Sequence, residues 1–176
     1  ASWIEKLDFV KEVNVTEPYI EYPPSCSGCG EVPYIHMVTQ MFGDRMIIAN
    51  ATGCTSIYGG TFPLIPYTKD KNGKGPAWAN SLFEDNAEFG YGFRLAIDNH
   101  NLQAKDLLKR FASEVGTDLV DALINATQKD EAEIYEQRER VSALKKKLED
   151  MLKAGANGKT SDIKHLLSLA DYLVKK

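Results

Sequence analysis

The sequence has few cysteines, no surplus of positive charge and no long apolar run, and each shortage excludes a class of protein. Its 176 residues carry a formal net charge of −4 and scattered basic residues, so nucleic acid is not an expected partner. No segment approaches the roughly 18 apolar residues that a membrane-spanning helix needs. Residues 1–11 lack the basic start and apolar centre of a signal peptide. We therefore expect a location in the cytoplasm, or in an organellar matrix such as that of the hydrogenosome.

The three cysteines are too few for a disulfide framework and favour a reducing compartment. Cys26 and Cys29 lie on a turn of serine and glycine, which lets both sulfurs reach one metal ion or cluster. Cys54 follows an apolar run, at a place where open α/β folds bind ligands beyond the carboxyl end of a strand. The pattern indicates metal chemistry.

The first half of the chain has the pattern of an α/β fold. Residues 1–25 are polar and rich in proline at their end, which predicts a connecting arm. A short helix is predicted from Pro33 to Gly43, because apolar residues there recur at helical spacing. The apolar run at residues 46–49 predicts a strand buried on both faces. Glycines and prolines predict a long loop over residues 59–76.

From residue 77 onward, leucine, alanine, lysine and glutamate dominate and the apolar residues recur every three or four positions. This pattern predicts three amphipathic helices and no strand between Leu102 and Leu152. After a glycine-containing break, a last helix is predicted with Thr160 or Ser161 as its N-cap. The expected apolar faces are formed by Leu102, Leu107, Leu108 and Phe111, by Leu119, Val120, Leu123 and Ile124, by Ile134, Val141, Leu144, Leu148 and Met151, and by Ile163, Leu166, Leu167, Ala170 and Leu173.

Several interpretations of the cysteines remain open at this point. A disulfide between Cys26 and Cys29, with Cys54 as a small buried residue, needs no metal. A c-type haem is excluded, because Gly30 stands where the attachment motif needs histidine. A stand-alone helical zinc-binding or interaction module would take His36 as a fourth ligand. An iron–sulfur cluster normally needs a fourth cysteine, which the sequence does not contain.

Three segments of the chain together resemble the pyruvate:ferredoxin (flavodoxin) oxidoreductases. They read CSGCGEVPY from Cys26, FGDRMIIANATGC from Phe42 and GPAWANSLFEDNAEFG from Gly75. The resemblance implies an α/β fold: part of a thiamine-diphosphate-binding fold, with a parallel sheet, flanking helices and a helix-rich C-terminal half. Residues 26–98 would belong to the thiamine-diphosphate and iron–sulfur domain, and residues 99–176 would be a helical insertion or extension of it.

The resemblance also implies the roles of individual residues. Cys26, Cys29 and Cys54 would be three thiolate ligands of the [4Fe–4S] cluster nearest to thiamine diphosphate, and Glu31 and Cys54 would face that cofactor. A cluster beside the cofactor can remove electrons one at a time after decarboxylation. The implied parent enzyme is a homodimer that converts pyruvate and coenzyme A to acetyl-CoA and CO₂ and reduces ferredoxin or flavodoxin.

The chain also departs from the family's pattern. The family's Gly-Asp-Gly segment and Asn-bearing loop, which bind the diphosphate and Mg²⁺, do not occur in it. The fourth cluster cysteine and the carboxylate that activates the pyrimidine belong to other segments of the family's proteins. We therefore expect no catalytic residue here, an inactive chain when it is alone, and a position of Lys176 just ahead of the diphosphate segment.

Overall fold

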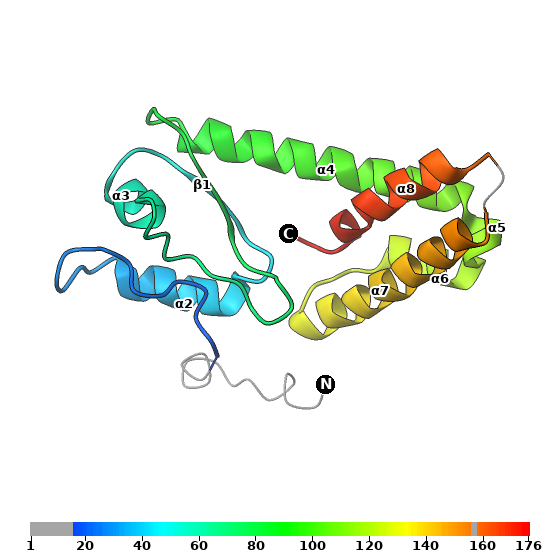
Figure 1. Ribbon diagram of the computed structural model, residues 1–176, viewed down its shortest axis with the longest axis horizontal. Coiled ribbons are helices and arrows are strands. Elements are labelled where there is room, and N and C mark those ends of the chain that lie inside the picture. The colour runs from blue at the N-terminus through cyan, green and yellow to red at the C-terminus, as the bar shows by residue number, and fades with distance from the viewer. Residues whose placement is uncertain (1–15, 156–157) are drawn as a thin grey trace. The chain divides into compact units, whose positions relative to one another are not determined.

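A computed structural model describes residues 16–155 and 158–176, which fall into two compact units (Figure 1). One unit comprises residues 16–94 and the other comprises residues 95–176. The boundary lies between Arg94 and Leu95, inside helix α4 (Asn86–Arg110). Of the predicted connecting arm, residues 1–15 lie outside the described residues. Among the helices that are described, none is long and apolar enough to span a membrane.

The unit of residues 16–94 has an α/β arrangement around a small parallel sheet. Helix α2 (Val32–Phe42) carries a proline in its first turn and ends at Gly43, which confirms the predicted short helix. Strand β1 (Ile47–Asn50) leads to helix α3 (Cys54–Gly60), and strand β2 (Ala77–Asn80) precedes α4. The two strands pair in parallel, with Ile47 opposite Ala77 and Asn50 opposite Asn80. Both carboxyl ends therefore lie on the same edge of the sheet.

One expectation for this unit is wrong, and two of its elements were not predicted. Strand β1 is not buried on both faces, because Ile47 is exposed and the rest of the strand is half-buried. A sheet of two strands gives little surface for other elements to cover. Strand β2 was not predicted, because it has only four residues and is too short to show a period. Helix α3 was not predicted at all, because it has seven residues and ends in two glycines, which are poor helix formers.

Close packing between α3 and β2 holds the helix on the sheet. A Cβ atom added to Gly60 would lie 2.8 Å from Cη2 of Trp78, and one added to Gly59 would lie 3.3 Å from Nε1 of the same indole. Only a residue without a side chain lets the indole of β2 approach the end of α3 this closely. The two glycines therefore fix where α3 lies relative to β2.

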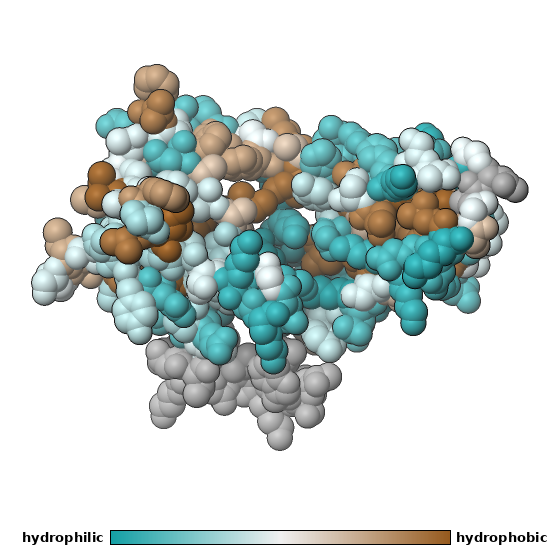
Figure 2. Space-filling view, viewed as in Figure 1, coloured by the Kyte–Doolittle hydropathy of each residue, from teal (hydrophilic) through white to brown (hydrophobic). Residues whose placement is uncertain are grey.

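This unit leaves much apolar surface uncovered. Its fully buried side chains are few, with Ile20 and Thr39 among them. Helix α2 exposes five large apolar side chains. Brown apolar atoms are also visible at several separate places on the surface of this unit in Figure 2. The exposed set on α2 comprises Tyr34, Met37, Val38, Met41 and Phe42. Contiguous apolar surface of this kind is typical of regions that contact other polypeptide segments.

The unit of residues 95–176 is helical and has the larger core. It contains the remainder of α4, α5 (Ala112–Val115), α6 (Thr117–Asn125), α7 (Glu131–Lys153), α8 (Thr160–Leu169) and the 3₁₀-helix η2 (Ala170–Leu173). No strand occurs between Leu102 and Leu152, all of which the structure describes, so that prediction is confirmed. The core includes Leu107, Leu108, Phe111, Val120, Leu123, Ile134, Val141, Leu144, Leu148, Ile163, Leu166, Ala170 and Leu173.

Two details of the helical prediction are wrong. Leu102 is 62% exposed, so it does not belong to the buried face of α4. Lys159 occupies the N-cap of α8, and no side chain caps that helix. Thr160 and Ser161 already lie inside its first turn. Helix α8 therefore begins at Thr160 without a capping side chain, and neither Thr160 nor Ser161 is the N-cap that the sequence predicts.

A buried glutamine joins the ends of two helical segments. Gln137 of α7 is fully buried, and its Nε2 donates to the carbonyl of Leu123 at 2.9 Å and to the carbonyl of Leu173 at 3.2 Å. These carbonyls lie at the C-terminal ends of α6 and η2, where backbone acceptors have no partner within the helix. The side-chain amide of Gln137 thus donates to carbonyls at the ends of α6 and η2, in place of a backbone N–H.

Replacing Gln137 with leucine should lower the free energy of unfolding by about 1–3 kcal/mol, because the buried carbonyl of Leu123 loses its side-chain donor. The carbonyl of Leu173 still accepts from Nε2 of Gln128 at 3.1 Å. Urea unfolding followed by circular dichroism measures the change. Glu139→Leu is the matched control, since Glu139 is exposed on the same helix and should change stability by no more than about 0.5 kcal/mol. Equal effects of the two substitutions would show that the bonds of Gln137 contribute no stability.

Candidate functional site

Polar side chains connect the two strands at the carboxyl edge of the sheet. Asn50 and Asn80 end their strands opposite one another, and Nδ2 of Asn50 donates to Oδ1 of Asn80 at 2.8 Å. The hydroxyl of Thr55 donates to Oδ1 of Asn50 at 2.8 Å. The hydroxyl of Thr52 donates to the carbonyl of Ser81 at 3.1 Å. These bonds fix the start of α3 beside the ends of both strands.

Cys54 is the first residue of α3 and lies at this edge. The N–H of Gly53 donates to Oγ of Ser56 at 2.6 Å, so a side chain of the first turn satisfies the backbone just before Cys54. The thiol of Cys54 is free and exposed. The structure therefore places Cys54 beyond the end of β1, where its position in the sequence predicts it, and the alternative of a small buried cysteine is wrong.

The first two cysteines lie on a tight turn ahead of α2. The N–H of Cys29 donates to the carbonyl of Cys26 at 3.1 Å, and Gly28 has a φ of +74°, a left-handed conformation that favours glycine. Cys26 is exposed, Cys29 is half-buried, and both thiols are free. The structure therefore confirms the predicted turn and contains no disulfide between them.

Glu31 connects this turn to α3. The hydroxyl of Tyr58, which is 2% exposed, donates to Oε2 of Glu31 at 3.3 Å. Burial raises the pKa of Tyr58 well above its usual range, and the negative charge of Glu31 raises it further. The tyrosine therefore remains a protonated donor at neutral pH. One side chain of α3 thus contacts the residue that precedes α2.

The three thiols fit an iron–sulfur cluster by their chemistry, since all are free, with Cys26 and Cys54 exposed and Cys29 half-buried. The described residues contain no group of three or more His, Cys, Asp and Glu side chains placed to hold a metal ion. The assignment of Cys26, Cys29 and Cys54 as ligands, and of Glu31 and Cys54 as cofactor contacts, therefore stays a prediction.

Sequence reasoning missed the residues that support these positions. The asparagine pair was not singled out, although each asparagine closes a short apolar run. Tyr58 was also missed. Its signal is its spacing, since it follows Cys54 by one helical turn and therefore lies on the same side of α3.

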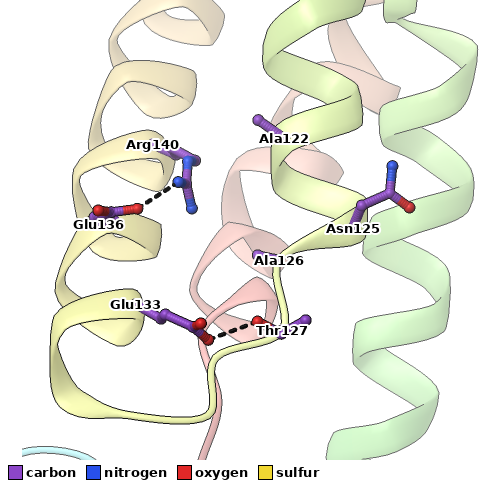
Figure 3. Close-up of a pocket in the computed structure, with 7 residues that line it drawn as sticks. All are labelled: Ala122, Asn125, Ala126, Thr127, Glu133, Glu136 and Arg140. Carbon is purple, nitrogen blue, oxygen red and sulfur yellow. Dashed lines mark hydrogen bonds and ion pairs between the residues drawn. The ribbon is translucent and has the colours of Figure 1, made fainter.

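A separate pocket of about 270 Å³ lies in the helical unit, between α6 and the first turns of α7 (Figure 3). The carboxylate of Glu133 accepts from the hydroxyl of Thr127 at 2.6 Å and from the N–H of Lys129 at 2.7 Å, and these bonds lower its pKa. Arg140 pairs with Glu136 at 2.7 Å. Because these polar groups bind one another, we assign no ligand to this pocket.

Comparison with known proteins finds relatives that match nearly the whole chain. No family model matches it. A pyruvate-flavodoxin oxidoreductase of Nostoc sp. is 53% identical over 97% of this chain, and a probable pyruvate-flavodoxin oxidoreductase of Escherichia coli is 49% identical over 99% of it. The chain spans about 14% of the length of each of these relatives. A pyruvate:ferredoxin oxidoreductase of Moorella thermoacetica is 62% identical over 50% of the chain. Over nearly its whole length the chain is therefore similar to one segment of the pyruvate-flavodoxin oxidoreductases.

Proposed function

We propose that this chain is the part of a pyruvate oxidoreductase that supplies three ligands of the [4Fe–4S] cluster nearest to thiamine diphosphate. The whole enzyme would oxidatively decarboxylate pyruvate, form acetyl-CoA and CO₂, and pass electrons to ferredoxin or flavodoxin. One observation carries the proposal: three free, accessible thiols occur in a chain that is about half identical to such oxidoreductases over 97% of its length.

Three residues of the chain would bind the cluster, and two would contact thiamine diphosphate. Cys26 and Cys29 would bind the cluster from their turn, and Cys54 would bind it from the carboxyl edge of the sheet. Glu31 and Cys54 would form part of the wall around thiamine diphosphate. When bound, thiamine diphosphate supplies the nucleophilic carbon for decarboxylation of a 2-oxo acid, and the cluster accepts single electrons. Since Cys54 would touch both groups, it shortens the path between them.

Other parts of the site would come from other polypeptide segments. The chain has no Gly-Asp-Gly segment for the diphosphate and Mg²⁺, and no fourth cysteine for the cluster. The apolar side chains on α2 offer a surface that such segments can cover. A homodimer of a longer polypeptide is the assembly we propose.

A stand-alone zinc module that uses His36 is not favoured. The relatives are oxidoreductases by name, and the identity to them extends over nearly the whole chain rather than over the cysteine segments alone.

Metal analysis of the full-length oxidoreductase that contains this segment tests the proposal. After anaerobic purification we expect iron and acid-labile sulfide in equal amounts, with a deficit of both in Cys29→Ala. Ser27→Ala is the matched control, because Ser27 lies on the same turn and carries no thiol. Stoichiometric zinc without sulfide, or a Cys29→Ala variant with its full iron, would contradict the proposal.

A further inference from the structure

Tyr58 and Cys54 lie on one face of α3. They are four positions apart in a helix that begins at Cys54, so their side chains are neighbours along the helix surface. Tyr58 is buried, whereas the thiol of Cys54 is exposed at the edge of the sheet. The hydroxyl of Tyr58 therefore directs its partner toward the side of α3 on which Cys54 also lies.

The group that the hydroxyl binds is the carboxylate of Glu31, at 3.3 Å. Glu31 is an exposed residue that occupies the N-cap of α2, and its side chain makes no capping hydrogen bond to that helix. An exposed glutamate has several accessible rotamers and loses entropy when it is held in one of them. The bond from Tyr58 selects the rotamer that points toward α3.

Tyr58 is the fixed partner of this pair. The glycines that follow it pack against Trp78, and a Cβ atom at Gly59 would lie 3.4 Å from Cε2 of Tyr67. Packing against Trp78 of β2 and the hydrogen bond from Thr55 to Asn50 therefore hold α3 in place. A rigid donor facing a flexible acceptor determines where the acceptor points.

We propose that Tyr58 is a positioning residue that fixes the Glu31 carboxylate on the face of α3 that carries Cys54. This inference rests on the proposed function, since it takes Glu31 to face thiamine diphosphate. Tyr58 itself acts only through Glu31. No role was assigned to it from the sequence.

The test uses full-length enzyme freed of thiamine diphosphate, with cofactor affinity measured by calorimetry. Tyr58→Phe removes only the hydroxyl and should weaken binding about tenfold, which is the loss expected for one hydrogen bond to a charged group. Glu31→Ala should weaken binding at least as much. The double variant should bind as weakly as Glu31→Ala and no more weakly, because the two residues act through one contact.

Tyr67→Phe is the matched control. Tyr67 is a neighbouring half-buried tyrosine whose pKa is raised by burial alone, so removal of its hydroxyl should leave cofactor affinity unchanged. The melting temperature and iron content of Tyr58→Phe should equal those of the unmodified enzyme.

Three results would overturn the inference. The first two are an unchanged affinity for thiamine diphosphate in Tyr58→Phe and an unchanged affinity in Glu31→Ala. The third is a double variant in which Tyr58→Phe weakens cofactor binding as much as it does when Glu31 is present. The proposed function fails separately, if Cys54→Ala keeps all of its iron, and that measurement does not involve Tyr58.

Discussion

Replacing Cys54 with alanine in the full-length oxidoreductase should remove iron from the cluster beside thiamine diphosphate and slow ferredoxin reduction about 100-fold or more. The thiol lies at the carboxyl edge of the sheet, and we propose that it touches both the cluster and the cofactor. Release of CO₂ from the first pyruvate should persist, because that step precedes electron removal. Single-turnover kinetics, with CO₂ release and ferredoxin reduction followed separately and iron determined in parallel, measures these effects.

Cys26→Ala provides the comparison for this experiment. Cys26 is also exposed, but it lies on the turn before α2 rather than at the sheet edge. The Cys26→Ala enzyme should lose cluster iron, with less effect on the geometry of thiamine diphosphate. Thr61→Ala serves as the neutral control near the end of α3, because Thr61 follows the helix and belongs to neither proposed set. If Cys54→Ala retains full iron and reduces ferredoxin at the normal rate, Cys54 is not a ligand.

A polypeptide of these 176 residues alone should show no decarboxylation of pyruvate and no micromolar affinity for thiamine diphosphate. The Gly-Asp-Gly segment that we propose binds the diphosphate and Mg²⁺ does not occur in this sequence. We propose that the carboxylate that activates the pyrimidine also lies on another segment. Three thiolates also leave one iron of a [4Fe–4S] cluster without a protein ligand. Calorimetry with thiamine diphosphate and Mg²⁺, and anaerobic reconstitution followed by absorption spectroscopy, measure both properties.

The control for the isolated polypeptide is its own folding. Circular dichroism should show a cooperative helical transition, because the unit of residues 95–176 has its own core around Leu144 and Leu148. Helical signal without cofactor binding would support the expectation. Micromolar binding, or a stable four-iron spectrum in the isolated polypeptide, would contradict it.

The sequence predicted those elements whose pattern is local and long. Helix α2 followed from a proline, a glycine and apolar spacing, and the helical half followed from leucines at three- and four-residue steps. The turn at Cys26 and the position of Cys54 beyond β1 also followed from local pattern. Each of these signals lies within a few residues, so it is visible without knowledge of the fold.

The missed features depend on contacts between distant residues. Strand β2 has four residues, and its identity follows from pairing with β1 rather than from its own composition. The exposure of Ile47 and Leu102 depends on which neighbours cover them, which periodicity does not reveal. The bond between Tyr58 and Glu31 joins residues 27 positions apart. No local rule connects such a pair.

The parallel pairing of β1 with β2 also determines an order of events during synthesis. Asn50 meets Asn80 only after the intervening loop has left the ribosome, and closure of a loop costs entropy that grows with its length. The helical unit gains most of its contacts between neighbouring helices and should form quickly once translated. The edge that carries Cys54 is therefore assembled only after β2 has emerged, so the surroundings of this thiol form late and not as the chain first appears.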